Sequence, residues 1–185
     1  LSYGAGTVTR TTSLSADGQY LVVGSGDYIH FFNSDNSTPL WSYTAGSRVS
    51  TVSISADGEY ITVGSWDQKV YLFDKDSNTP LWTYSTNYNV RSVKISSDGE
   101  YIVAGGNSNK VYLFDKDSST PLWIYTTGND VYSVGISSDG EYIVAGSEDD
   151  KLYLFDKDSN TPLWTYDAGE NVQTVSISAD GEYIV

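Results

Sequence analysis

The chain contains no cysteine, no methionine and a single histidine, His30, among its 185 residues. The absence of cysteine excludes disulfide bridges, thiolate metal sites and cysteine nucleophiles. With one histidine and no cysteine, Ser-His-Asp and Cys-His catalytic arrangements have no support. No apolar run approaches the roughly 20 residues that a membrane-spanning helix requires. We therefore expect neither membrane insertion nor catalytic residues of these classes.

Positive charge is also scarce. Ten Lys and Arg residues stand against 24 Asp and Glu residues, which gives a formal net charge of −14. Such a surface repels phosphate backbones, because nucleic-acid binding draws much of its affinity from Lys and Arg. We therefore expect no nucleic-acid partner.

The main feature present is a 41-residue repeat, which is read in four copies. Tryptophan and proline mark it at intervals of 41 residues: Trp41, Trp82, Trp123 and Trp164, with Pro39, Pro80, Pro121 and Pro162. A second marker is an Asp-Gly turn, which starts at Asp17, Asp57, Asp98, Asp139 and Asp180. A period of about 20–50 residues indicates units that bury their faces against their neighbours.

Each repeat contains four short apolar runs separated by turn residues, which is typical of antiparallel strands. In the second copy, strands are expected over residues 49–55, 60–64 and 69–74, with a short fourth strand over 80–84. Asp57-Gly58 favours a tight hairpin between the first two strands. Pro80 cannot donate to a strand ladder, so the fourth strand is expected at the outer edge.

A four-stranded antiparallel unit of about 40 residues is typical of a β-propeller blade. A β-solenoid is the rival, but its repeats are usually shorter and lack three turn signals per copy. The prediction is a single all-β propeller domain over residues 1–185, with four-stranded blades at 4–43, 44–84, 85–125 and 126–166.

A partial blade is expected over residues 167–185. Residues 1–3 have the pattern of the end of a fourth strand, and 172–185 that of first and second strands. We expect the chain to be part of a larger ring, with assembly of several chains through unpaired blade edges as the alternative.

Two propeller families share features with the repeat. The pattern VxSVxISxDGEYIVAGS at 131–147 resembles WD-repeat propellers. The pattern VYLFDKDSxTPLW resembles the tryptophan-docking repeat of pyrroloquinoline-quinone-type (PQQ-like) propellers, with Asp74, Ser77 and Trp82 at the family spacing. The resemblance implies a propeller scaffold. The Gly-His and Trp-Asp pairs of WD repeats and the adjacent cysteines of quinone dehydrogenases are missing, and no matching calcium or quinone ligands are found. No cofactor is therefore expected.

The copies differ mainly on one rim. The Asp-Gly turns and the third-to-fourth turns barely vary, and both emerge on the same rim of a propeller. The opposite rim carries the fourth-to-first and second-to-third loops, where residues 65–68, 106–109 and 147–150 differ. Loops on a rigid scaffold tend to carry binding residues. We call this second surface the variable rim and treat it as the candidate functional face.

The binding residues predicted on the variable rim are Arg10, Arg48, Trp66, Arg91, Tyr132 and Gln173. Arg10 and Arg91 align with Ser50, Tyr132 and Gln173, and this position is expected to ring the mouth of the central channel. Guanidinium groups suit carboxylates and phosphates. The alternative is that the arginines balance neighbouring acids such as Asp130 and Glu170.

Trp66 is the only tryptophan outside the repeat position. Exposed aromatic side chains are enriched at binding hot spots. The alternative is packing against an adjacent loop, over Tyr28 or Tyr88.

No metal site is expected. Asp74, Asp76 and Asn78 have the spacing of a calcium loop, but the required glycine and distal glutamate do not follow, which favours turn capping. The acidic run 148–150 could hold a cation weakly or be solvated. His30 occupies the position of Tyr71 and is expected to be an ordinary sheet residue.

The function hypothesis is a non-catalytic scaffold that binds a protein or a small ligand through the variable rim. Two alternatives stay open: the scaffold part of a PQQ-type quinoprotein enzyme, and a structural subunit of an extracellular filament or layer. A surface rich in Ser, Thr, Tyr and Asp, with the sequon Asn36-Ser37-Thr38, favours an extracellular or cell-surface location, and a cytoplasmic one is left open.

Overall fold

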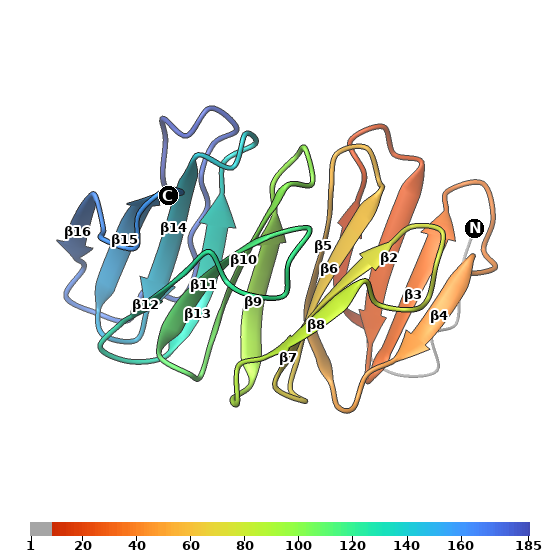
Figure 1. Ribbon diagram of the computed structural model, residues 1–185, viewed down its shortest axis with the longest axis horizontal. Coiled ribbons are helices and arrows are strands. Elements are labelled where there is room, and N and C mark those ends of the chain that lie inside the picture. Colours follow the sequence, from red (N-terminus) through yellow and green to blue (C-terminus); the bar gives the residue numbers. More distant parts are fainter. Residues whose placement is uncertain (1–8) are drawn as a thin grey trace.

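The computed structural model describes residues 9–185 and contains sixteen strands in four sheets (Figure 1). The first sheet comprises β1 (Thr9–Leu14), β2 (Tyr20–Ser25), β3 (Tyr28–Asn33) and β4 (Trp41–Thr44). The second comprises β5 (Val49–Ile54), β6 (Tyr60–Ser65), β7 (Lys69–Asp74) and β8 (Trp82–Ser85). The third comprises β9 (Val90–Ile95), β10 (Tyr101–Gly106), β11 (Lys110–Asp115) and β12 (Trp123–Thr126). The fourth comprises β13 (Val131–Ile136), β14 (Tyr142–Ser147), β15 (Lys151–Asp156) and β16 (Trp164–Asp167).

Each sheet is an antiparallel meander whose strands pair in chain order. The first strands lie side by side, with β1 against β5, β5 against β9 and β9 against β13. Figure 1 shows the sheets following one another in chain order, each twisted against the next. The all-β prediction of four-stranded propeller blades is confirmed. No helix in residues 9–185 is long and apolar enough to cross a membrane.

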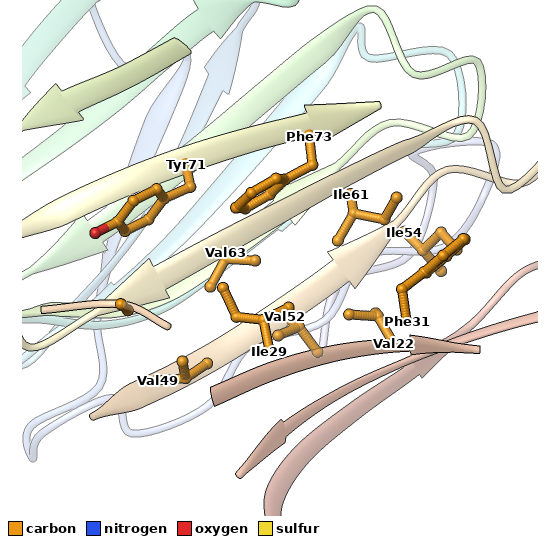
Figure 2. Packing of buried hydrophobic residues seen from close by; sticks show 11 residues of the cluster. Val22, Ile29, Phe31, Val49, Val52, Ile54, Ile61, Val63, Tyr71 and Phe73 are labelled. Atoms are coloured by element: carbon orange, nitrogen blue, oxygen red, sulfur yellow. The ribbon is translucent and has the colours of Figure 1, made fainter. Parts of the chain in front are cut away.

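The core lies between neighbouring blades. Val22, Ile29 and Phe31 of the first sheet pack against Ile61 and Phe73 of the second, and all five side chains are fully buried (Figure 2). The second strand β10 is apolar on both faces because it lies between two such layers, with Ile102 in one and Val103 in the other. Burial of this kind favours stacking by roughly 25 cal/mol per Å² of apolar surface removed from water.

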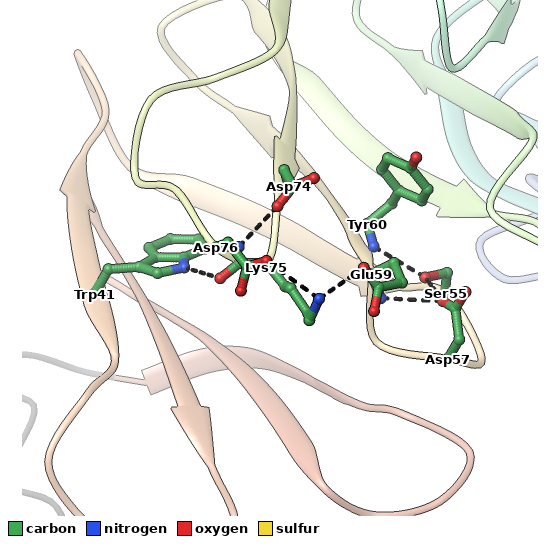
Figure 3. A network of polar contacts seen from close by, with 8 residues as sticks. All are labelled: Trp41, Ser55, Asp57, Glu59, Tyr60, Asp74, Lys75 and Asp76. Carbon is green, nitrogen blue, oxygen red and sulfur yellow. Dashed lines mark hydrogen bonds and ion pairs between the residues drawn. The ribbon is translucent and has the colours of Figure 1, made fainter.

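The rim that carries the Asp-Gly turns, which we call the turn rim, repeats one set of bonds. In the second blade Asp57 accepts hydrogen bonds from the Ser55 hydroxyl (2.6 Å) and from the Glu59 amide (3.0 Å), and Ser55 Oγ accepts from the Tyr60 amide (3.0 Å) (Figure 3). Successive turns are also joined between blades, because the Ala56 amide donates to the Ser97 carbonyl at 2.9 Å.

An indole lock connects each blade to the next on the same rim. Trp41 Nε1 donates to the Lys75 carbonyl, Trp82 to Lys116 and Trp123 to Lys157, each at 2.7 Å. Figure 3 shows Trp41 reaching the third-to-fourth turn of the second blade. The periodic tryptophans therefore act between blades as well as within them.

The C-terminal segment differs from its prediction. Residues 172–185 form one isolated bridge, Ile177–Ile184, in place of two strands. The Asp-Gly turn itself is present, with the Ser178 amide donating to the Tyr183 carbonyl at 2.9 Å. Tyr183 is 70% exposed. No third strand pairs with this hairpin among the described residues. Its apolar pattern alone does not produce two regular strands. The strand prediction for residues 1–3 lies outside the described residues.

Candidate functional site

A cavity of about 560 Å³ lies on the variable rim. Its lining brings together every predicted binding residue and one additional serine: Arg10, Arg48, Ser50, Trp66, Arg91, Tyr132 and Gln173. These residues belong to different repeats, so the cavity exists only when the blades are stacked. The geometry places them together, and the role of the cavity in binding remains a prediction.

A β-bulge in each first strand directs the lining side chains. Pairing runs from Val49 opposite Ser65 to Thr51 opposite Gly64 and skips Ser50, so Ser50 is the extra residue. The same irregularity falls at the aligned positions Arg10, Arg91 and Tyr132. Bulges re-aim side chains and are common beside functional sites.

Glycine lies opposite each bulge because the approach there is close. A Cβ on Gly64 would lie 2.7 Å from Val90 Cγ1 and 2.8 Å from Thr51 Cγ2. The repeated glycine of the second strand therefore allows the neighbouring first strand to pack beside the bulge. The glycine can be seen in the sequence, but the β-bulge beside it is visible only in the structure.

Arg48 and Trp66 form a stacked pair. Arg48 Cζ lies 3.2 Å from the centroid of the Trp66 ring. The Trp66 amide also donates to the Arg48 carbonyl at 2.9 Å, so the two loops are tied through their backbones. Trp66 thus packs against an adjacent loop, as the alternative proposed, and its partner there is the Arg48 guanidinium.

The Arg48 guanidinium is incompletely satisfied. Its Nε is buried and has no hydrogen-bond partner among the described residues. Burial, followed by the positive charge of Arg10, lowers the pKa of Arg48 from its ordinary value. Within residues 9–185 no carboxylate forms an ion pair with Arg10 or Arg48.

Arg91 has a different environment. Its Nε donates to Asn107 Oδ1 at 2.6 Å, and one terminal nitrogen lies 3.4 Å from Asp130 Oδ2. Its Cζ lies 4.8 Å from the centroid of the Tyr132 ring. The alternative in which an arginine balances an acid therefore describes Arg91 with Asp130. An ion pair with Glu170 is not formed among the described residues.

The remaining lining groups are polar. The Ser50 hydroxyl is close to two backbone carbonyls, those of Gly64 (2.9 Å) and Val90 (2.6 Å), and holds adjacent blades together. Hydrogen bonding to Glu148 raises the pKa of Tyr132 above its usual range. Gln173 is exposed. Ser50 is thus engaged in structure, while Gln173 is accessible to a ligand.

Two acids, Asp67 and Asp149, fix loops of the variable rim; the sequence indicated no role for Asp67 and suggested for Asp149 only a weak cation site or a solvated loop. Asp149 accepts from the Tyr153 hydroxyl (2.5 Å) and the Gly128 amide (2.6 Å). Asp67 is in the same position and accepts from Tyr71 and from the Gly46 amide. The detectable signal is an Asp four residues before the Tyr of the third strand.

The hydrogen bonds to Asp149 affect its protonation. Burial raises the pKa of its carboxyl, but bonds from Tyr153, Gly128 and Ser147 outweigh burial and hold the pKa below its ordinary value. Asp149 is therefore ionised, and its carboxylate holds the fourth-to-first loop through the Gly128 amide.

The acidic turn strings act as caps. The Asp76 amide donates to Asp74 Oδ1 at 2.8 Å, as expected for turn capping. In the part of the chain that the structure describes, no three His, Cys, Asp or Glu side chains are grouped to hold a metal ion.

Comparisons with known proteins identify the repeat. A family profile described as "Outer membrane protein assembly factor BamB" (PQQ_2) matches residues 5–136. A profile described as "WD domain, G-beta repeat" matches residues 119–156. No curated protein matches the chain significantly.

A solved structure has a similar fold. A chain in "Crystal Structure of Mitotic Checkpoint Complex" aligns with a TM-score of 0.80 and 18% identity, over 97% of this chain and 74% of that chain. At this identity the likeness shows the fold alone.

Proposed function

The chain belongs to the propeller-repeat family described as outer membrane protein assembly factor BamB, and we propose that it is a non-catalytic scaffold that binds a partner through its variable rim. The description of the family as an assembly factor supports a protein partner, with a small ligand as the second possibility. Propeller scaffolds commonly place interaction residues on loops that a rigid sheet stack positions.

The observation that carries the proposal is the position of the cavity. Seven residues at positions where the repeats differ line one hollow of about 560 Å³ on the variable rim. Concave sites with a few convergent polar groups are the usual form of binding sites. The turn rim, in contrast, uses its polar groups in bonds within and between blades.

A peptide-display selection against the chain tests the proposal. Selected peptides should lose binding to a Trp66→Ala, Arg10→Ala double variant and keep binding to Asp117→Ala, which changes an exposed residue of the turn rim. Peptides that bind both variants equally would place the contact surface elsewhere. Melting temperatures of the variants show whether each is folded.

Two alternatives have their own tests. A quinoprotein enzyme predicts quinone absorbance after reconstitution of the full-length protein with calcium, and an absence of absorbance contradicts it. A filament or layer subunit predicts large species in light scattering, whereas a monomer contradicts it.

We also propose an extracellular or cell-surface location, supported by the Ser-, Thr-, Tyr- and Asp-rich composition. Fractionation of the native host tests this, and recovery only in the cytoplasmic fraction would contradict it.

A further inference from the structure

We propose, building on the binding role proposed for the rim cavity, that the cavity is a receptor for a compact oxyanion, a carboxylate or a phosphate monoester, held by Arg10 and Arg48. Three observations lead to this inference: where the positive charge lies, which guanidinium is satisfied, and what supports Arg48.

The charge distribution is the first observation. The protein carries a net charge of −14 and has three arginines, yet all three line one cavity. Its lining includes no acidic side chain among the described residues. Like charges that converge destabilise one another unless an anion compensates them. A charged ligand of opposite sign would provide that compensation.

The second observation separates the three arginines. Arg91 already has partners in Asn107 and Asp130. Arg10 and Arg48 have no carboxylate partner within residues 9–185, and Arg48 Nε is both buried and unbonded there. A buried donor without a partner is destabilising, because it has lost its water without a replacement. Arg10 and Arg48 are therefore the guanidiniums whose charge no carboxylate balances within residues 9–185.

The third observation is that Arg48 is held in place. Its guanidinium lies 3.2 Å from the Trp66 ring centroid, and its carbonyl accepts from the Trp66 amide and from the Ser65 hydroxyl (3.1 Å). A stacked guanidinium retains its in-plane N–H groups, which can bind an oxyanion in bidentate geometry. A fixed donor also loses little conformational entropy on binding.

The size of the ligand follows from the cavity. A volume of about 560 Å³ accommodates a small molecule or one side chain of a partner. The acids Asp130 and Glu148 lie beside Arg91 and Tyr132 and repel extended polyanions. A compact anion on the side of Arg10 and Arg48 avoids them. The free acid and the acidic side chain of a protein share this chemistry.

An NMR titration tests the inference directly. Three arginines give three Nε–H signals, which single Arg→Lys substitutions assign. Titration with inorganic phosphate, with succinate and with a short peptide containing one glutamate should shift the Arg48 and Arg10 signals saturably. The Arg91 signal should move less, because Asn107 already accepts from its Nε.

Variants quantify the role of Arg48. Arg48→Gln should weaken the binding of the responding probe by roughly tenfold or more, as expected for the loss of one charge-assisted contact. Lys116→Gln removes the same charge on the turn rim and should leave binding unchanged. Arg48→Lys keeps the charge but loses the planar fork, so intermediate binding is expected.

The outcomes are distinct. Saturable shifts with phosphate, with succinate or with the peptide support the inference, and the tightest probe identifies the source. Shifts that are linear in concentration, or equal in Arg48→Gln and Lys116→Gln, overturn it. Display peptides that need the rim but bind without an acidic group would contradict the oxyanion site and leave the scaffold function standing.

Discussion

The two rims of the propeller use the same repeat in opposite ways. On the turn rim, the Ser-x-Asp-Gly turns form the same bonds in successive copies, and the indole lock recurs at 2.7 Å. On the variable rim, the β-bulge is repeated but the residue at its apex changes from Arg10 to Ser50, Arg91 and Tyr132. The bulge recurs in the first strands of all four sheets, and the side chains differ most on the variable rim.

This difference indicates how stability and recognition are separated. The indole lock joins the blades at positions where the copies agree, whereas Arg48, whose buried Nε has no hydrogen-bond partner among the described residues, lies where the copies differ. Many side chains of the variable rim can therefore differ between copies without loss of the bonds that join the blades on the turn rim. The predictions below test this separation, in order of expected effect on stability.

The largest effect is expected at the indole lock. Trp82→Ala removes the bond to the Lys116 carbonyl and the packing on Phe114, whose ring centroid lies 5.3 Å away. The apparent free energy of unfolding should fall by about 3 kcal/mol, as for large core truncations. Urea denaturation followed by circular dichroism measures this loss.

Trp164→Ala is the matched control for the lock. Trp164 occupies the same repeat position but is 41% exposed, and no following indole acceptor is described for it. Its loss should cost less than about 1 kcal/mol. Equal costs for Trp82 and Trp164 would show that the tryptophans act within their own blades and not between them.

The next effect is expected at two glycines with positive φ, one on each rim. Gly140 has φ +75°, and an added Cβ would lie 2.4 Å from Tyr101 Cδ2. Gly169 on the variable rim has φ +74° with nothing within 4 Å. Gly169→Ala should cost about 1 kcal/mol from backbone strain alone, and Gly140→Ala clearly more. The difference in urea midpoint between the two variants measures the clash of the added Cβ with Tyr101. A larger loss for Gly169→Ala than for Gly140→Ala would contradict close packing at the turn rim.

A pH effect is expected at the Asp-Gly turn. Bonds from the Ser137 hydroxyl and the Glu141 amide hold the pKa of Asp139 below its ordinary value. A carboxyl whose pKa is lower in the folded state stabilises the fold above its unfolded pKa of about 4. This stabilisation is lost as the pH falls through the folded pKa.

Asp139→Asn keeps an acceptor oxygen but cannot titrate. The stability advantage of the original chain over this variant should shrink between about pH 5 and pH 2. Asp35→Asn, which changes an exposed turn residue, controls for net charge. Thermal unfolding across this range measures the effect, and a constant difference between chain and variant would contradict it.

The smallest effect is expected on the variable rim. Trp66 is 40% exposed and contacts Arg48 through its ring face. Trp66→Ala should cost no more than about 1 kcal/mol, the usual range of an exposed cation–π pair. A double-mutant cycle with Arg48→Ala isolates the coupling. A loss in the free energy of unfolding similar to that of Trp82→Ala would show that both rims stabilise the fold to a similar extent.

Much of the fold was predictable because its signals are local and repeated. Asp-Gly turns and apolar runs mark the strands, so the third strand at 69–74 was predicted to the residue. The fourth strand starts at Trp82 and not at Pro80, since proline has no amide to donate. Arg10, Arg91 and Tyr132 were expected around the mouth of a central channel, and they line one cavity because neighbouring first strands lie side by side.

The missed features depend on contacts between loops. No sequence pattern predicts the positive φ of three non-glycine residues in the second-to-third turns, namely Gln68, Asn109 and Asp150. Those turns direct Asp67 and Asp149 back to tyrosines of the third strand. The stack of Arg48 on Trp66 likewise joins two loops from different connections. Segment 172–185 shows the reverse case, in which the strand pattern is present but the neighbouring strand is not described.

The indole lock has a consequence for how such a chain can evolve. Its acceptor is a main-chain oxygen 34 residues away, so the bond is indifferent to which side chains the receiving turn carries. We therefore expect duplication, deletion or exchange of whole 41-residue units to preserve this indole bond. Recombination between gene segments of this length would change the side chains of the variable rim while the indole bond between blades is kept.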